Sequence, residues 1–170
     1  MGRRFNGKVA PITGGAGGYG LAAAELSAAH GRHVGIAGLR GSKGDHVAVH
    51  SCAAGREVVC APLHLSETSK AAVTGHYVEA ALGSTTVSVK PTGSFSAVPL
   101  LDATGVEWGR VLAVNANSML SVTRAVQPAL MGSGGASIAS TSTLSAVAET
   151  AMALLHSTSK GAGHMPACAT

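Results

Sequence analysis

A run of glycines near the amino terminus has the chemistry of a phosphate-binding turn. The segment Thr13-Gly14-Gly15-Ala16-Gly17-Gly18-Tyr19-Gly20 follows a short apolar run and precedes a helical one. Glycines let a backbone turn sharply and approach a pyrophosphate, and the helix N-terminus that follows presents free N–H groups and a positive dipole end. A tight turn without a ligand has a similar composition, but the strand–turn–helix context favours phosphate binding.

Histidines and cysteines are the other residues whose spacing suggests chemistry. His46 and His50 are four residues apart on a predicted helix with Cys52 close by, a spacing that can place two metal ligands on one face. No recognisable motif fixes a third ligand, and exposed helix histidines are common. The cysteines, which include Cys60 and Cys168, lack CxxC spacing and are predicted to be free thiols in a reducing compartment. We therefore expect no metal site, and a histidine-based metal-binding protein is a remote alternative.

The elements that must position these residues alternate along the chain. Short apolar runs predict strands at 8–13, 33–37, 57–62, 86–89 and 136–142. Helices are predicted at 21–30, 42–53, from a cap at Ser66 to about 82, and from about 105 to 131. Near-continuous apolar strands separated by helices predict a doubly wound parallel sheet, because right-handed crossovers cover both of its faces. Its ligand crevice is expected at the carboxyl ends of the strands.

Composition excludes several classes of protein. With 170 residues, 46% of them apolar and 12% charged, the chain can bury a core and is not disordered. No linker or internal repeat interrupts it, so residues 1–170 are expected to form a single domain. The formal charge of +4 arises from scattered basic residues that cluster only at Arg3-Arg4, and this excludes a nucleic-acid footprint. No apolar run has the length of a signal peptide or membrane span, so we expect no membrane partner and a cytoplasmic location.

Several motifs, in one order and at matching spacings, resemble the short-chain dehydrogenase/reductase family. The spacing Thr13-Gly14-x-x-x-Gly18-x-Gly20 resembles its glycine motif, and Lys90-Pro91-Thr92-Gly93 is placed like its Asn-Asn-Ala-Gly. The segment 108–115 is similar to the family's fourth helix and ends at Asn115. Thr143 stands at the family's serine position, and thirteen residues later His156-Ser157-Thr158-Ser159-Lys160 stands where the family has Tyr-x-x-x-Lys. The resemblance extends over essentially the whole chain and implies a Rossmann fold with strand order 3-2-1-4-5.

The resemblance implies an NAD(P)-dependent oxidoreductase that transfers hydride between a nicotinamide cofactor and an alcohol or ketone. In the family the tyrosine is the general acid/base, and the lysine lowers its pKa and binds the nicotinamide ribose. The serine orients the carbonyl, and the asparagine holds a water in the proton relay. Carried over by position, the catalytic set is Asn115, Thr143, His156 and Lys160. Asn115 and Lys160 match the family, and Thr143 keeps a hydroxyl.

His156 is the main departure from the family pattern. Imidazole exchanges protons near neutral pH and can act as a general acid or base. It is shorter than a phenol, however, and a misplacement of about 1 Å can cost roughly a hundredfold in rate. A neighbouring Lys160 ammonium would also disfavour the imidazolium. A catalytically inactive homologue that binds only a dinucleotide or a protein partner is therefore the main alternative.

The resemblance also suggests which residues contact the cofactor. They are Gly14, Gly18, Tyr19, Gly20, Gly38, Arg40, His64, Leu65, Gly93 and Lys160. NAD-preferring members carry an acid at the end of the second strand, where this chain has Gly38, with Arg40 two residues on. Losing that carboxylate removes repulsion against a 2′-phosphate, and a guanidinium can pair with one, so NADP is favoured over NAD. A solvated loop charge is the other interpretation of Arg40. His64 stands where the family has an aspartate at the adenine.

Two features are unfavourable for the predicted fold. Pro11 falls within the central first strand and removes a ladder donor, so a local bulge or a lost hydrogen bond is expected there. Family members continue through two more strands and a substrate-covering loop after the lysine motif. The resemblance therefore implies either a fragment or a C-terminally shortened homologue. In both cases the fifth strand is expected to be an exposed edge, which favours a homo-oligomer.

Overall fold

The computed structural model describes residues 5–38, 43–53, 55–64, 67–90, 93–148 and 151–163. Five strands form one parallel sheet in the order β3-β2-β1-β4-β5. They are β1 (Val9–Thr13), β2 (His33–Gly38), β3 (Val58–Pro62), β4 (Val87–Lys90) and β5 (Ser137–Ser140). The predicted doubly wound sheet and its strand order are confirmed.

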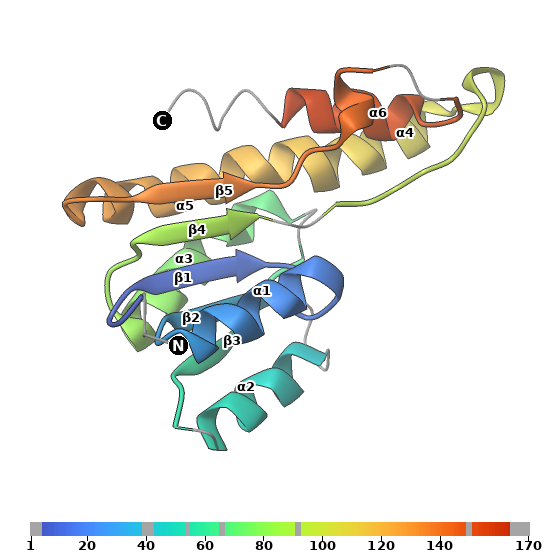
Figure 1. Cartoon of the computed structure of the whole chain (residues 1–170). Helices are drawn as coiled ribbons and strands as arrows, with labels where there is room; N and C mark the ends of the chain where they lie inside the picture. The colour runs from blue at the N-terminus through green and yellow to red at the C-terminus, as the bar shows by residue number, and fades with distance from the viewer. Residues whose placement is uncertain are drawn as a thin grey trace.

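Helices cover both faces of the sheet (Figure 1). On one face α1 (Gly18–Ala29) and α2 (Lys43–Ala53) pack together, and on the other α3 (Ala71–Leu82) packs beside α5 (Ser118–Gly132). Beyond the carboxyl ends of β4 and β5, α4 (Gly105–Leu112) contacts α6 (Leu154–Ala162). Short 3₁₀ turns form η1 (Thr68–Lys70), η2 (Leu100–Asp102) and η4 (Leu144–Ala146). The predicted cap Ser66 lies outside the described residues.

Small side chains let the layers approach closely. Under α1 the core contains Ile12 and Ile36 from the sheet, with Ala24 and Ala28 from the helix. On the other face Gly35 of β2 has no room for a side chain, because a Cβ there would lie 2.5 Å from a methyl carbon of Val78 in α3. A chain with few aromatic residues fills its core by such close backbone approaches.

The irregularity predicted at Pro11 appears as a shift of register between β1 and β4. Val9 lies opposite Thr85, whereas Ile12 lies opposite Val89, so two residues of β1 face three residues on the β4 side. The N–H that Pro11 lacks is one that the β1–β4 ladder would otherwise use. The hydroxyl of Thr86 accepts from the N–H of Val9 at 3.0 Å and holds the two strands together at this point. The predicted bulge is confirmed.

The Gly35–Val78 contact predicts opposite outcomes for two Gly→Ala changes. Gly35→Ala should destabilise the fold by about 1–3 kcal/mol, because the new methyl overpacks a stiff β-branched neighbour. Gly75→Ala in α3 is the matched control: its Cβ would meet Ala125 at an ordinary 3.7 Å. The helix should gain up to about 1 kcal/mol there. Urea unfolding would measure both changes, and equal effects would contradict the close-packing account.

Candidate active site

The glycine turn after β1 is built on positive φ angles and one very close backbone contact. Gly14 and Gly18 adopt φ of 65° and 50°. A Cβ at Gly20 would lie 2.2 Å from the carbonyl oxygen of Gly14, closer than any side chain permits. The N–H of Gly14 donates to the carbonyl of Ala37 at 2.8 Å and ties the turn to β2. The turn therefore requires glycine at these positions for steric reasons.

The helix that follows the turn carries no capping side chain and no acidic residue in its own first turn. It begins at Gly18, three residues before the predicted start, so Gly18, Tyr19 and Gly20 form its first turn. Its N-cap, Gly17, supplies no side-chain acceptor, and the first turn holds no acidic residue. Tyr19 is 85% exposed. This arrangement fits a pyrophosphate, which accepts from N–H groups and is attracted by the helix dipole.

The ends of β2 and β3 lie next to this turn. Gly38 ends β2, and its carbonyl accepts from the N–H of Leu63 at 2.7 Å. His64 follows β3 with an exposed side chain, and its carbonyl accepts from the N–H of Glu67 at 2.8 Å. Arg40 and Leu65 lie outside the described residues. Of the two residues that favoured NADP in the sequence, Gly38 therefore has a described position and the guanidinium of Arg40 does not.

The predicted long helix is interrupted at the family's asparagine position. A π-helical turn, η3 (Ala113–Asn117), separates α4 from α5. Such turns release backbone groups from regular pairing and are frequent at functional sites. Asn115 lies within it and is 1% exposed. The sequence pattern did not predict this break, because hydrophobic periodicity continues through it.

The Asn115 side chain holds the backbone of Ser94, the residue after Gly93. Its Oδ1 accepts from the N–H of Ser94 at 2.6 Å, and its Nδ2 donates to the carbonyl of Ser94 at 2.8 Å. Nδ2 also donates to the hydroxyl of Ser159 at 2.8 Å, and that hydroxyl donates to the carbonyl of His156. Arg110 of α4 donates to the hydroxyl of Ser94. Ser94 and Ser159 were not singled out from the sequence, although each is adjacent to a residue that was.

Lys160 is packed against Gly93. It is 4% exposed, its Nζ donates to the carbonyl of Thr141 at 3.0 Å, and burial lowers the pKa of its ammonium. A Cβ at Gly93 would lie 2.7 Å from Nζ, so glycine makes room for the lysine head group. The segments that follow β4 and β5 thus both contact this ammonium, through Gly93 and Thr141.

His156 and Thr143 occupy different surroundings. The Nδ1 of His156 lies 3.1 Å from the carbonyl oxygen of Ser94, and its ring meets the ring of Phe95 edge-on with centroids 5.0 Å apart. The hydroxyl of Thr143 caps η4 and lies 3.2 Å from the hydroxyl of Ser145. Asn115, His156 and Lys160 therefore gather around the segment 93–94, and the contacts of Thr143 lie within its own loop.

Lys90, at the end of β4, is buried against α5. It is 4% exposed, and its Nζ donates to the hydroxyl of Thr123 in α5. Burial lowers the pKa of Lys90 to about 8. The ammonium is therefore part of the contact between sheet and helix and is not directed at a bound phosphate.

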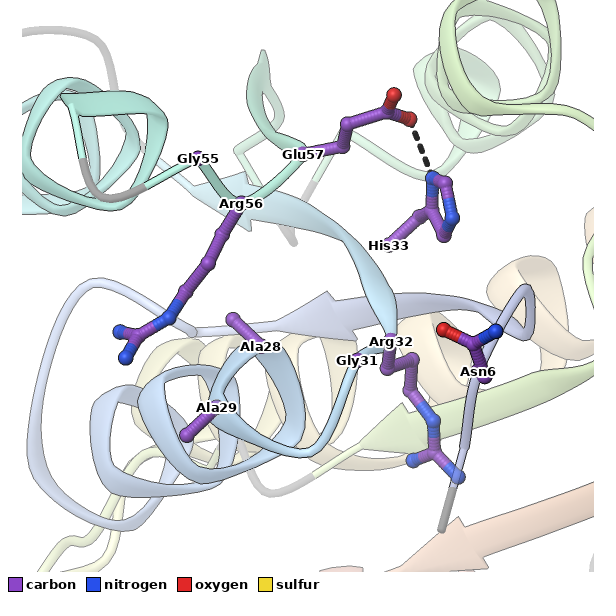
Figure 2. A pocket seen from close by; sticks show the side chains of 9 residues that line it. All are labelled: Asn6, Ala28, Ala29, Gly31, Arg32, His33, Gly55, Arg56 and Glu57. Carbon is purple, nitrogen blue, oxygen red and sulfur yellow. Dashed lines mark hydrogen bonds and ion pairs between the residues drawn. The ribbon is translucent and has the colours of Figure 1, made fainter. Parts of the chain in front are cut away.

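A hollow of about 300 Å³ lies near the amino-terminal ends of β2 and β3, lined by residues that precede these strands (Figure 2). His33 and Glu57 point toward one another there, whereas Arg32 and Arg56 extend in different directions. The guanidinium of Arg32 stacks over the ring of Phe5 at 3.9 Å. These charges do not converge on one point, and the hollow is separate from the candidate active site.

The described part of the chain contains neither a metal-ligand cluster nor a membrane-spanning helix. No three His, Cys, Asp or Glu side chains gather there in a way that could hold a metal ion. None of its helices combines the length and apolar character needed to cross a bilayer.

Comparison with known proteins agrees with the motifs and the geometry. A family profile described as short chain dehydrogenase matches residues 8–168. The chain belongs to the short-chain dehydrogenase family. A short chain dehydrogenase/reductase from Burkholderia phymatum in complex with NAD superposes with a TM-score of 0.90 over 95% of this chain, at 24% identity. That likeness establishes the fold.

Two further solved structures share somewhat more sequence with this short-chain dehydrogenase. A metagenomic short-chain oxidoreductase in complex with NADP matches 97% of the chain at 26% identity and a TM-score of 0.90. A short chain dehydrogenase from Burkholderia cenocepacia J2315 in complex with NADP matches 94% at 28% identity and a TM-score of 0.87. The matches cover 75% and 65% of those two chains, and 58% of the B. phymatum chain. This chain thus spans less than two thirds of the length of some relatives.

The Gly20–Gly14 contact predicts a position-specific loss of stability. Gly20→Ala should destabilise the fold by about 1–3 kcal/mol, because the methyl would overlap a backbone oxygen that cannot move aside. Gly17→Ala is the matched control, since its Cβ would meet nothing within 4 Å. Gly17 is the N-cap of α1, where alanine is less favourable than glycine, so we expect this control to lose less than about 1 kcal/mol in urea unfolding. A neutral Gly20→Ala would show that the turn follows another path.

Burial of Lys90 predicts a pH dependence of stability. Its folded pKa of about 8 lies below the ordinary 10.5, so the unfolded chain binds the proton more tightly. Protonated Lys90 therefore destabilises the fold below about pH 8, and the free energy of unfolding should rise as the pH increases from about 8 to 10.5, by at most about 3 kcal/mol.

Lys90→Met should raise the unfolding midpoint near neutral pH and flatten this rise. Thr123 stays satisfied in the variant, because its hydroxyl donates to the carbonyl of Met119. Thermal unfolding of parent and variant across this pH range measures the difference. An unchanged pH profile in the variant would mean that Lys90 contributes nothing to it.

Proposed function

We propose that this chain binds a nicotinamide dinucleotide at the carboxyl ends of β1, β2 and β4, with NADP preferred, and transfers hydride between it and an alcohol or ketone. The observation that carries the proposal is the Gly20–Gly14 contact beneath an α1 N-terminus that has no capping side chain or acid. Tight glycine packing keeps side chains away from the first-turn N–H groups, where a pyrophosphate binds best.

The residues that would hold the cofactor follow the strand ends. Gly14 and the first turn of α1 would take the pyrophosphate. Gly38 and Arg40 would face the adenosine ribose, His64 and Leu65 the adenine, and Gly93 and Lys160 the nicotinamide ribose. When bound, the dinucleotide supplies the carbon that accepts or delivers the hydride. The related structures that contain NADP support the choice of a nicotinamide dinucleotide.

The remaining chemistry would be done by side chains around the segment 93–94. His156 would exchange the substrate proton, and Thr143 would orient the carbonyl with its hydroxyl. Both hydrogens of the Asn115 amide are donated to Ser94 and Ser159, and its oxygen accepts from Ser94, so Asn115 would act as a positioning residue. Lys160 would donate hydrogen bonds to the ribose while anchored to Thr141.

A second candidate function is dinucleotide binding without catalysis. The His156 ring is held by Ser94 on one side and packs against Phe95, and it is shorter than the phenol that the family uses. A proton-transfer atom that falls short of the substrate would leave binding intact and remove turnover. His156→Tyr separates the two functions, because restored length should raise turnover only if the rest of the pocket is present.

Self-association and a cytoplasmic location also belong to the proposal. Val106 of α4 is 85% exposed and Leu154 of α6 is 41% exposed, on two helices that pack together. Apolar side chains at such a surface favour a homo-oligomer. Sedimentation velocity of the chain with Val106→Glu, compared with the parent, would reveal a shift to a smaller species if this surface is the interface.

Calorimetric titration with NADPH and NADH tests the binding step. We expect NADPH to bind more tightly, and Lys160→Met to weaken binding by about tenfold through the loss of a charge-assisted hydrogen bond. Lys8→Met, at an exposed lysine before β1, is the matched control and should bind as the parent does. Absence of heat with both nucleotides would rule out the proposed function. Binding without absorbance change at the nicotinamide across a panel of ketones and alcohols would leave only the second candidate.

A further inference from the structure

The carbonyl oxygen of Ser94 accepts two hydrogen bonds. One comes from the Nδ2 of Asn115 at 2.8 Å and the other involves the Nδ1 of His156 at 3.1 Å. A carbonyl oxygen has two lone pairs and no hydrogen to give, so both partners must be donors. The ring nitrogen that faces Ser94 therefore carries a hydrogen.

We infer that the Ser94 carbonyl fixes His156 in the Nδ1–H tautomer, so that Nε2 carries the lone pair and is the atom that exchanges the substrate proton. This inference rests on the proposed function. Nε2 makes no hydrogen bond to any described part of the chain. The side chain at the tyrosine position thus has one nitrogen anchored to Ser94 and the other without a hydrogen-bond partner among the described residues.

The anchor itself is held in place. The Asn115 amide binds both the N–H and the carbonyl of Ser94, and Arg110 donates to the Ser94 hydroxyl at 2.8 Å. Ser159 connects the same amide to the carbonyl of His156 in the first turn of α6. Loop and helix are therefore positioned by one buried side chain, which fixes the distance between Ser94 and the imidazole.

The proton balance follows from the tautomer. In alcohol oxidation the substrate O–H bond breaks and an Nε2–H bond forms, while the hydrogen on the carbinol carbon leaves as hydride to the oxidised nicotinamide. The imidazolium then gives its Nε2 proton to water. In reduction, the same Nε2–H protonates the alkoxide. The Nδ1–H···O=C bond is kept in both states and strengthens when the ring is charged, because charged donors form stronger hydrogen bonds.

This arrangement resembles the way an orienting group fixes the histidine tautomer in serine hydrolases, with a main-chain carbonyl in place of a carboxylate. A carbonyl is a weaker acceptor than a carboxylate, but it too requires a hydrogen on the ring nitrogen that faces it. A neutral Nδ1–H ring is the form that a base for alcohol oxidation requires.

The tautomer can be read directly by NMR of the full chain labelled with ¹⁵N in histidine. Long-range ¹H–¹⁵N correlations, recorded at a pH where the rings are neutral, distinguish the protonated nitrogen from the bare one. His156→Gln identifies the His156 signals among the eight histidines. We expect Nδ1–H at His156 and the usual Nε2–H at His76, an exposed histidine of α3 that serves as the internal control. An Nε2–H tautomer at His156 would overturn the inference.

Two variants separate the role of Nδ1 from that of Nε2. His156→Asn keeps an N–H donor at the position of Nδ1 but has no atom at that of Nε2, whereas His156→Ala has neither. We expect His156→Asn to unfold at a higher temperature than His156→Ala and to bind NADPH as the parent does. Its turnover should fall on the order of a hundredfold or more, as the loss of a general base predicts. Parent-like turnover in His156→Asn would exclude Nε2 as the proton carrier.

The two proposals fail in different ways. If NADPH does not bind the parent chain, the proposed function is lost, while the NMR spectrum still decides the tautomer. If NADPH binds and His156 is Nε2–H, the proposed function survives and the inference is lost. If the Nδ1–H tautomer is present but no alcohol or ketone reacts, the proton-exchange half of the inference is wrong and the chain is the non-catalytic binder.

Discussion

The candidate site depends on one buried amide, that of Asn115. Its three hydrogen bonds to Ser94 and Ser159 connect the loop after β4 to the first turn of α6. A buried amide without hydrogen-bond partners lowers the stability of the fold. The network therefore stabilises the protein only when each of its polar groups is hydrogen-bonded. The π-helical turn that contains Asn115 carries the amide to this point between two helices. The positions of His156 and Lys160 follow from that junction.

Close backbone approach is the second constraint, and it explains why a chain with so few large side chains still packs its layers. Gly35 brings β2 against α3, Gly20 brings α1 against the turn after β1, and Gly93 leaves room for the Lys160 ammonium. Each contact removes space that any side chain would need. The glycine turn after β1 and the core therefore rely on the same property of glycine, which couples the stability of the fold to the shape of the proposed site.

Buried lysines give the two neighbouring strand ends different roles. Lys160 donates to a carbonyl beside the crevice, whereas Lys90 donates to Thr123 beneath α5. Burial lowers the pKa of both ammonium groups, because a charged group is penalised when it leaves water. Of these two lysines, Lys160 is the one that contacts the segment 93–94, so it is the lysine that the proposed nicotinamide site can use, and Lys90 affects mainly the stability of the sheet.

The sequence by itself determined the parallel sheet, the glycine turn and the irregularity at Pro11, because hydrophobic period, glycine placement and the missing proline N–H are local properties. The strand order came from the resemblance of its motifs to the family. The motif spacing also singled out Asn115, His156 and Lys160, which the structure brings together around the segment 93–94. Tertiary structure alone decided that Lys90 is buried against α5, that a π-turn interrupts the long helix, and that Ser94 is the partner of His156. These features depend on contacts between residues far apart in the chain, such as Ser94 and His156, 62 positions apart. The residues next to Ser94 and next to His156 in the sequence therefore give no sign that these two residues meet in the fold.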